Sequence, residues 1–137
     1  MYMLIRYIIY GLIGWCLEVF WTGFGSLTRG NFRLPARTYL WMFFIYGLAV
    51  LLEPVHNKLR SHPVLLRGGI YVLIIFSLEY VTGWFLKSTV TVCPWDYSGT
   101  DYSVNGFIRL DYAPLWFLCG LLFEQIHDYL LFIQNKI

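Results

Sequence analysis

Three glutamates interrupt otherwise apolar segments, and their type and position make them the strongest candidates for chemistry. Glu18 is the only charged residue within 7–27, Glu79 is the only one within 68–86, and Glu124 follows a third apolar run. A charge at the centre of a bilayer costs about 2.5–3.5 kcal/mol on insertion scales, so such groups usually face the interior of a helix bundle and have a partner. These acids therefore predict either a binding site inside a bundle or ion pairs that hold it together.

The residues around these acids predict which helix faces point inward. Small residues that recur in helical steps of three and four allow close helix packing. Glu18 shares its expected face with Gly11, Gly14, Thr22 and Gly25. Similar stripes accompany the other two acids, with Thr82 and Gly83 beside Glu79 and with Gly120, His127 and Asp128 beside Glu124.

A polar, aromatic loop at 93–106 is the second candidate element. It repeats Asp-Tyr-Ser at 96–98 and 101–103 and ends in the turn dipeptide Asn105-Gly106. Rings, hydroxyls and carboxylates at this density predict either a binding lip or an interfacial loop. In the second case Trp95 and Tyr97 anchor at the headgroups while Asp96 and Ser98 cap a turn. Arg29 and Arg33, in another loop, offer guanidinium groups suited to a phosphate, a carboxylate or the glutamates.

The composition of the whole chain indicates whether these residues belong to a soluble protein or to a membrane protein. Of the 137 residues, 58% are apolar and only 13% are charged, whereas a soluble domain has about 25% charged residues. This excludes a disordered chain, a nucleic-acid-binding tail and an ordinary soluble domain. The net charge of +2 is too small to indicate an anionic partner. We therefore expect an integral membrane protein with no nucleic-acid partner.

The apolar runs predict an all-α bundle of four transmembrane helices in a single domain covering 1–137. The expected spans are 4–24, 38–54, 66–87 and 112–134. Residues 25–38 and 88–111 then share one side of the membrane, and the three glutamates are staggered beneath that side. Lysines and arginines divide equally between the two sides, so the positive-inside rule does not decide the orientation. We expect cytoplasmic termini because the arginines of the opposite side are expected to belong to a folded site.

An ordered set of short motifs runs along nearly the whole chain. It consists of Gly14-Trp15-Cys-Leu-Glu18, Arg29-Gly30, Ile45-Tyr46-Gly47, Glu79, Cys93-Pro-Trp-Asp-Tyr-Ser98, Asn105-Gly106 and Glu124. This pattern resembles the bacterial family named "putative ABC-transporter type IV" and its vertebrate relatives, the transmembrane protein 229 family. The Trp-Asp-Tyr-Ser block is the most specific element, whereas the Gly-Pro that follows Arg-Gly in many bacterial members is absent here. The resemblance implies a small multipass membrane protein and adds Tyr46 to the expected binding residues.

Several functions remain open at this point. Intramembrane acids and the family name favour a permease for a small solute or ion, which four helices would build only as a homo-oligomer or with partner membrane subunits. The alternatives are a non-catalytic scaffold or a protein that binds membrane lipids, and then an enzyme acting on lipid headgroups through Glu18 or Glu79. No P-loop is present for ATP hydrolysis.

We favour a non-enzymatic role and expect no cofactor and no metal. Glu124-x-x-His127 has the spacing of di-iron bundles, but such sites normally need two Glu-x-x-His pairs and we expect only this one to be available here.

Overall fold

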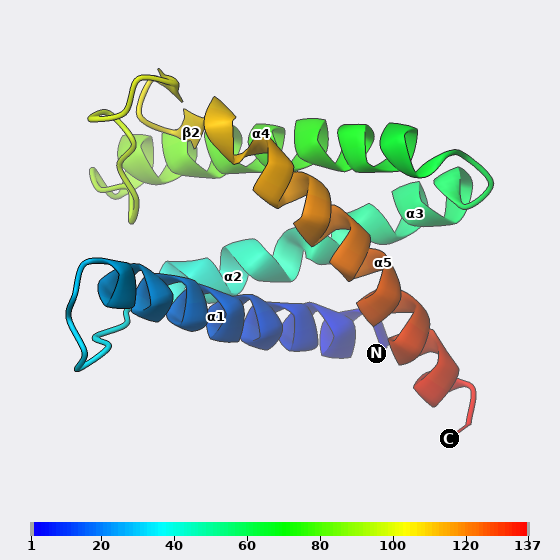
Figure 1. Cartoon of the computed structure of the whole chain (residues 1–137). Coiled ribbons are helices and arrows are strands. Elements are labelled where there is room, and N and C mark those ends of the chain that lie inside the picture. Colours follow the sequence, from blue (N-terminus) through cyan, green and yellow to red (C-terminus); the bar gives the residue numbers. More distant parts are fainter. Residues whose placement is uncertain (1, 137) are drawn as a thin grey trace. The chain divides into compact units, whose positions relative to one another are not determined.

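The computed structural model describes residues 2–136, and this part of the chain contains four helices long and apolar enough to cross a membrane (Figure 1). The prediction of an all-α fold with four such helices is confirmed. The described chain divides into two compact units, residues 2–51 and 52–136. The elements are α1 (Tyr2–Thr28), α2 (Leu40–Gly47), η1 (Leu48–Leu52), α3 (Glu53–Leu59), α4 (Val64–Thr89), β1 (Ser103–Val104), β2 (Ile108–Arg109), η2 (Leu110–Tyr112) and α5 (Ala113–Gln134).

The first unit is a helical hairpin in which α1 packs against α2 through glycines. A Cβ added at Gly14 would lie 2.3 Å from Cγ of Tyr46, and one added at Gly11 would lie 2.7 Å from the carbonyl oxygen of Phe43. Real Cβ atoms do not approach this closely, so only glycine permits the observed helix separation. The predicted small-residue face of the first helix is therefore a packing face.

The second apolar helix differs from its predicted bounds of 38–54, because it runs from Leu40 to Leu59 in three pieces. The 3₁₀ segment η1 ends at Leu52, and α3 begins at Glu53 with Pro54 in its first turn. Proline lacks a backbone donor, but the first turn of a helix has unsatisfied donors in any case, so the chain can begin a new helix there. The expected spans left residues 55–65 as a loop, but only residues 60–63 separate α3 from α4.

In the second unit, α4 and α5 also approach each other at glycines. A Cβ at Gly68 would meet the ring of Phe117 at 2.1 Å, and a Cβ at Gly120 would meet Tyr71 at 2.5 Å. The loop between these helices carries a short antiparallel hairpin, β1–β2, whose turn residues Asn105 and Gly106 both have positive φ angles. The helix bounds of α4 and α5 lie close to the predicted spans.

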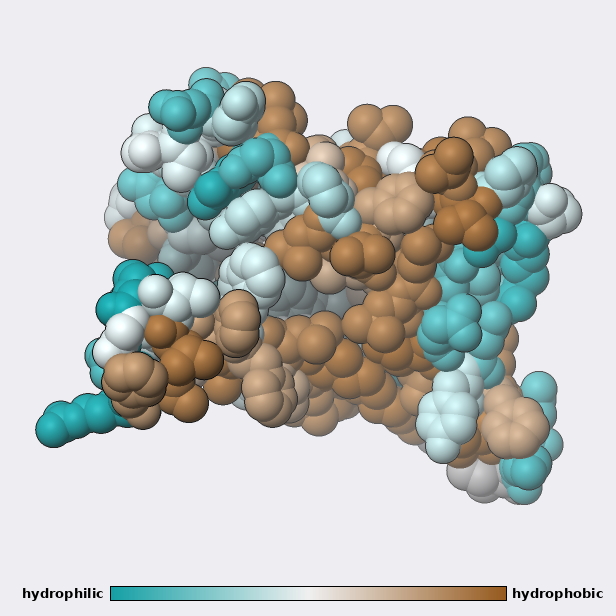
Figure 2. Space-filling model, viewed as in Figure 1, coloured by the Kyte–Doolittle hydropathy of each residue, from teal (hydrophilic) through white to brown (hydrophobic). Residues whose placement is uncertain are grey.

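Large apolar side chains are exposed along the long helices. Phe20 is 77% exposed, and Leu73 and Leu118 are also largely exposed. Figure 2 shows hydrophobic residues over much of the visible helical surface, with hydrophilic residues gathered mainly at loops and chain ends. A surface of this kind is suited to lipid and not to water.

Candidate functional site

The Glu18 carboxylate lies in the first unit and is held by neutral hydroxyl groups. The Oγ1 of Thr38 donates to Glu18 Oε2 at 2.8 Å, and the Tyr46 hydroxyl donates to the same oxygen at 3.1 Å. Thr38 comes from the loop before α2 and Tyr46 from α2 itself, so the carboxylate joins α1 to both. Within the described residues of this unit, no arginine forms an ion pair with Glu18.

The Glu79 carboxylate lies in the second unit and has aromatic donors. Nε1 of Trp116 donates to Oε2 at 3.1 Å, and the Tyr97 hydroxyl donates to Oε1 at 3.4 Å. The donors come from α5 and from the loop before it, so Glu79 is the point at which α4, α5 and that loop meet. Across residues 52–136, no lysine or arginine forms an ion pair with this carboxylate.

The loop at 93–106 folds onto α4 close to Glu79. Nε1 of Trp95 donates to the carbonyl oxygen of Phe107 at 2.8 Å, which fixes the indole against the hairpin. A Cβ at Gly83 of α4 would lie 2.9 Å from Phe107 and 3.1 Å from Trp95, so glycine there allows the loop to dock. Farther along, the Asn105 side chain donates to the Tyr80 hydroxyl of α4 at 2.8 Å.

Asp96 and Ser98 form a turn in this loop and do not reach the Glu79 carboxylate. The backbone N–H of Ser98 donates to Oδ1 of Asp96 at 2.9 Å, and the Ser98 hydroxyl bonds to the same oxygen. These hydrogen bonds favour the charged carboxylate and lower the pKa of Asp96 below its ordinary value of 3.8. The two residues therefore hold the shape of the loop while Tyr97, between them, points its hydroxyl at Glu79.

Glu124 has a different environment because its partners are basic. Arg67 binds it through two nitrogens, with Nε 2.9 Å from Oε1 and Nη2 3.1 Å from Oε2. The Tyr71 hydroxyl donates to Oε1 at 2.8 Å. Glu124 is 3% exposed. Glu124 and Arg67 therefore form a buried, bidentate ion pair that joins α5 to α4, and this pair is separate from the Glu79 site.

A second Glu-x-x-His pair, Glu53-x-x-His56 on α3, crosses with Glu124-x-x-His127 on α5. Nδ1 of His56 lies 3.2 Å from Oε1 of Glu124, and Nδ1 of His127 lies 3.3 Å from Oε1 of Glu53. The two imidazole centroids are 5.7 Å apart. The sequence reasoning missed this arrangement because the expected span ended at residue 54 and excluded His56. His127 is only 1% exposed and is not a solvated residue at a helix end.

Asp128 extends this cluster toward the loop before α4. It accepts hydrogen bonds from both terminal nitrogens of Arg60, with Nη1 3.0 Å from Oδ2, and from His56 at 3.2 Å. The acids and histidines thus bind one another and two arginines. Among residues 2–136, no group of three potential ligands is arranged to hold a metal ion.

The expected site residues therefore gather in separate places. Tyr46 joins Glu18 in the first unit, and Tyr97 joins Glu79 in the second, with Trp95, Asp96, Ser98 and Asn105 shaping the loop around it. Arg29 lines a cavity at the end of α1, whereas Arg33 is exposed and lines no cavity that we describe. Glu124 stands with Arg67. The role of each as a binding residue stays a prediction.

Comparison with known proteins supplies the family. No solved structure matches the chain. One family model covers residues 5–136, which is nearly the whole sequence and leaves out only the first three residues of the described helices. With four apolar helices and a family of membrane proteins, the chain is an integral membrane protein related to transporters by its family name. It belongs to the family described as "putative ABC-transporter type IV".

Proposed function

We propose that this protein binds a small cationic solute at the Glu79 carboxylate and takes part in moving it across the membrane. The observation that carries the proposal is that both Glu79 oxygens accept hydrogen bonds from neutral aromatic donors, Trp116 and Tyr97. This carboxylate has no basic partner within residues 52–136, whereas Glu124 is already matched by Arg67.

The rings around Glu79 suit a cation as well. Tyr97 and Tyr112 pack edge to face with centroids 5.8 Å apart, and Tyr112 packs against Trp116 at 6.0 Å. Aromatic faces attract cations, most strongly where water is excluded. The guanidinium carbon of Arg109 already lies 4.6 Å from the Tyr112 centroid, so this cluster accepts a positive charge in the folded chain. A carboxylate with three rings is typical of sites for organic cations or weakly hydrated metal cations.

Glu18 offers related chemistry in the other unit. Its carboxylate is also held by neutral donors, the hydroxyls of Thr38 and Tyr46. Two acids of this kind within apolar helices are typical of solute or ion routes. Four helices form a thin wall for such a route, so the proposal includes a homo-oligomer or partner membrane subunits.

Cation binding to the purified protein tests the proposal. Sodium, potassium, tetramethylammonium and tetraethylammonium would each be titrated by calorimetry into the protein in lipid nanodiscs. We expect at least one to bind, and we expect Glu79→Gln to weaken that binding by about tenfold or more. Asp101→Asn removes the same charge from an exposed position of the loop and is the matched control. Binding by none of the four cations, or equal binding by both variants, would contradict the proposal.

A structural role without transport is the second candidate, and the Glu124 cluster favours it. An acid matched by Arg67 and a crossed pair of Glu-x-x-His motifs specify how helices pack without requiring a solute. Proteoliposome uptake separates the two candidates, because a scaffold gives no uptake of any cation that binds.

A further inference from the structure

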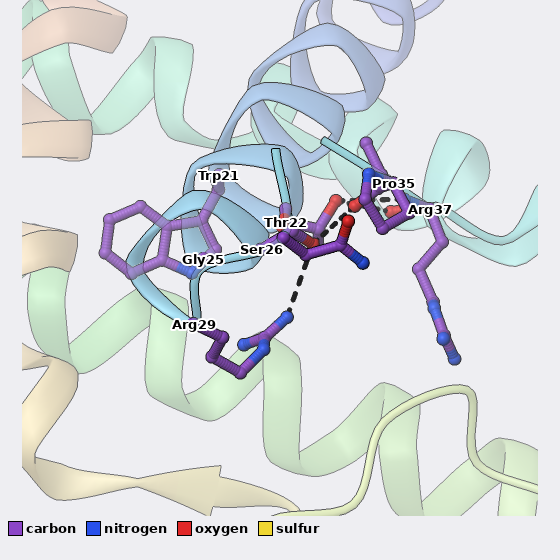
Figure 3. Close-up of a pocket in the computed structure, with 9 residues that line it drawn as sticks. Trp21, Thr22, Gly25, Ser26, Arg29, Pro35 and Arg37 are labelled. Carbon is purple, nitrogen blue, oxygen red and sulfur yellow. Dashed lines mark hydrogen bonds between the residues drawn. The ribbon is translucent and has the colours of Figure 1, made fainter. Parts of the chain in front are cut away.

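The first unit contains a cavity of about 560 Å³ where α1 ends and the chain turns back toward α2. Trp21, Thr22 and Ser26 of α1 form one wall, and the loop supplies Arg29 and Arg37. In Figure 3 the two arginine side chains arise from opposite sides of the cavity: the Arg29 guanidinium turns toward Ser26, and the Arg37 side chain extends away from the loop. These are the charged residues of its lining.

The backbone that carries these arginines is fixed to α1 by hydrogen bonds. The N–H of Arg37 donates to Oγ1 of Thr22 at 3.0 Å, and that hydroxyl bonds to the Arg37 carbonyl oxygen at 3.0 Å. One turn later, the Ser26 hydroxyl donates to the Pro35 carbonyl oxygen at 2.5 Å. Arg29 Nη2 lies 3.4 Å from the same Ser26 hydroxyl. The cavity is therefore pre-formed, which lowers the entropy lost on binding a ligand.

The charge of the first unit is strongly positive. Residues 1–51 contain four arginines and a single acid, Glu18, so this part of the chain is basic although the whole protein carries only +2. Among the described residues of this unit, neither Arg29 nor Arg37 forms an ion pair, and Glu18 is engaged by Thr38 and Tyr46. Two guanidinium groups at one cavity provide planar, multiple donors that match phosphate oxygens.

The position along the chain indicates where that phosphate comes from. Arg29 directly follows the end of α1 at Thr28, and Arg37 lies just before α2 begins at Leu40. The ends of membrane-crossing helices lie near the headgroups. On α1, Trp21 of the cavity wall is 51% exposed, and Phe24, its neighbour one helical turn later, is 62% exposed, so exposed apolar rings lie at the edge of the cavity. A ligand with a phosphate at one end and hydrocarbon at the other fits both features.

We propose that this cavity binds the phosphate ester of a membrane phospholipid, with Arg29 and Arg37 on the phosphate and the acyl chains along the exposed Trp21 and Phe24 side chains of α1. The site is distinct from Glu79 and does not depend on cation binding there.

Native mass spectrometry of the full-length protein released from detergent tests this site. The probes are dioleoylphosphatidylglycerol and dioleoylglycerol, which have the same acyl chains with and without a phosphate. We expect the phospholipid to bind, and we expect the double variant Arg29→Gln/Arg37→Gln to bind it at least about tenfold more weakly. Arg33→Gln is the matched control because Arg33 belongs to the same loop but lies outside the cavity lining.

A second variant separates the cavity from the charge. Ala36→Leu adds bulk to the lining and keeps both arginines, so it should also weaken phospholipid binding. Circular dichroism establishes that each variant is folded, and Ala36→Leu remains informative if the double variant is not.

Four results would overturn the proposal. Equal losses in Arg33→Gln and in the double variant would show a general effect of charge. Unchanged binding in both the double variant and Ala36→Leu would place the lipid elsewhere, and equal binding of dioleoylglycerol would exclude phosphate recognition. Inorganic phosphate that displaces the phospholipid at millimolar concentration, and binds alone to the wild type but not to the double variant, would identify free phosphate as the ligand.

Discussion

The two ends of the α4–α5 pair each contain a glutamate, but the two glutamates have opposite kinds of partner. Near one end, Glu124 meets Arg67, Tyr71 and His56, so its charge is matched and the side chain is buried. Near the other end, Glu79 receives hydrogen bonds from Trp116 and Tyr97 without a basic partner in its unit. Both acids lie on helices of similar hydropathy. The partners supplied by neighbouring elements, and not the acid itself, therefore separate a structural site from a candidate binding site.

Among variants that test this comparison, the largest loss of stability is expected at Glu124. Glu124→Gln leaves the partly buried Arg67 guanidinium without its charge partner, and breaking a buried ion pair in this way typically costs about 3–5 kcal/mol. The free energy of unfolding in detergent measures this loss. Arg67→Gln should cost a similar amount, and the double variant should cost clearly less than both together. Additive single effects would show that the pair is not coupled.

The second largest loss of stability is expected in the helix packing beside Glu18, whose carboxylate accepts hydrogen bonds from neutral hydroxyl groups. Gly14→Leu places a side chain where Tyr46 already lies, and overpacking of this kind costs about 1–3 kcal/mol. Gly69→Leu is the control, because a Cβ at Gly69 meets nothing within 4 Å. Thermal unfolding of the two variants measures the difference. Equal melting temperatures would argue against a packed face beside Glu18.

Glu79→Gln and Glu18→Gln are expected to have smaller effects on stability. At position 18 the amide oxygen of glutamine can still accept from both Thr38 and Tyr46, which donate to the same carboxylate oxygen. At position 79 it can accept from Trp116, while the Tyr97 hydroxyl can accept from the amide NH₂ group, so each variant should lose less than about 1.5 kcal/mol. Cation binding should fall in Glu79→Gln despite this small loss. A stability loss as large as that of Glu124→Gln would erase the distinction between the two ends.

The smallest expected effect is local and depends on pH. The hydrogen bonds from Ser98 lower the pKa of Asp96, so they stabilise the turn fully when the pH is above the ordinary value of 3.8. As the pH falls below 3.8 and passes through the lowered pKa, Asp96 becomes protonated and this stabilisation is lost. Hydrogen exchange of the Ser98 amide, corrected for its intrinsic pH dependence, should show protection near neutral pH that decreases only below that value. Asp96→Ala should lack this protection at every pH, whereas a protected Ser98 amide in that variant would assign the protection to another contact.

Local patterns in the sequence predicted much of the fold but fewer of the contacts. Apolar runs located the four long helices because lipid-facing helices need continuous hydrophobic residues, and the spacing of Gly11 and Gly14 predicted the packing face of α1. The end of the second helix was missed because the expected span stopped at Pro54, which lies in the first turn of α3. Proline has both roles, and tertiary contacts decide between them.

The partners of the acids were less predictable because they are distant in sequence. Glu124 and Arg67 are 57 residues apart. Any of several arginines fitted the composition equally well, and only the packing of α4 on α5 selects Arg67. For Glu79, the nearby Trp-Asp-Tyr-Ser motif did indicate the element that covers it, and Tyr97 is its most direct contact.

The crossed Glu-x-x-His pairs also impose an order on the assembly of the chain. The helix α3 has only seven residues, and helices this short are marginal on their own. Its side chains find their partners on α5, and His56 is separated from Asp128 by 72 residues. At about 5–20 residues per second, a ribosome needs roughly 4–14 s to make that interval. During synthesis Glu53 and His56 are therefore made several seconds before their partners on α5. Within the second helix, α3 is thus the part that can complete its contacts only after α5 has been synthesised.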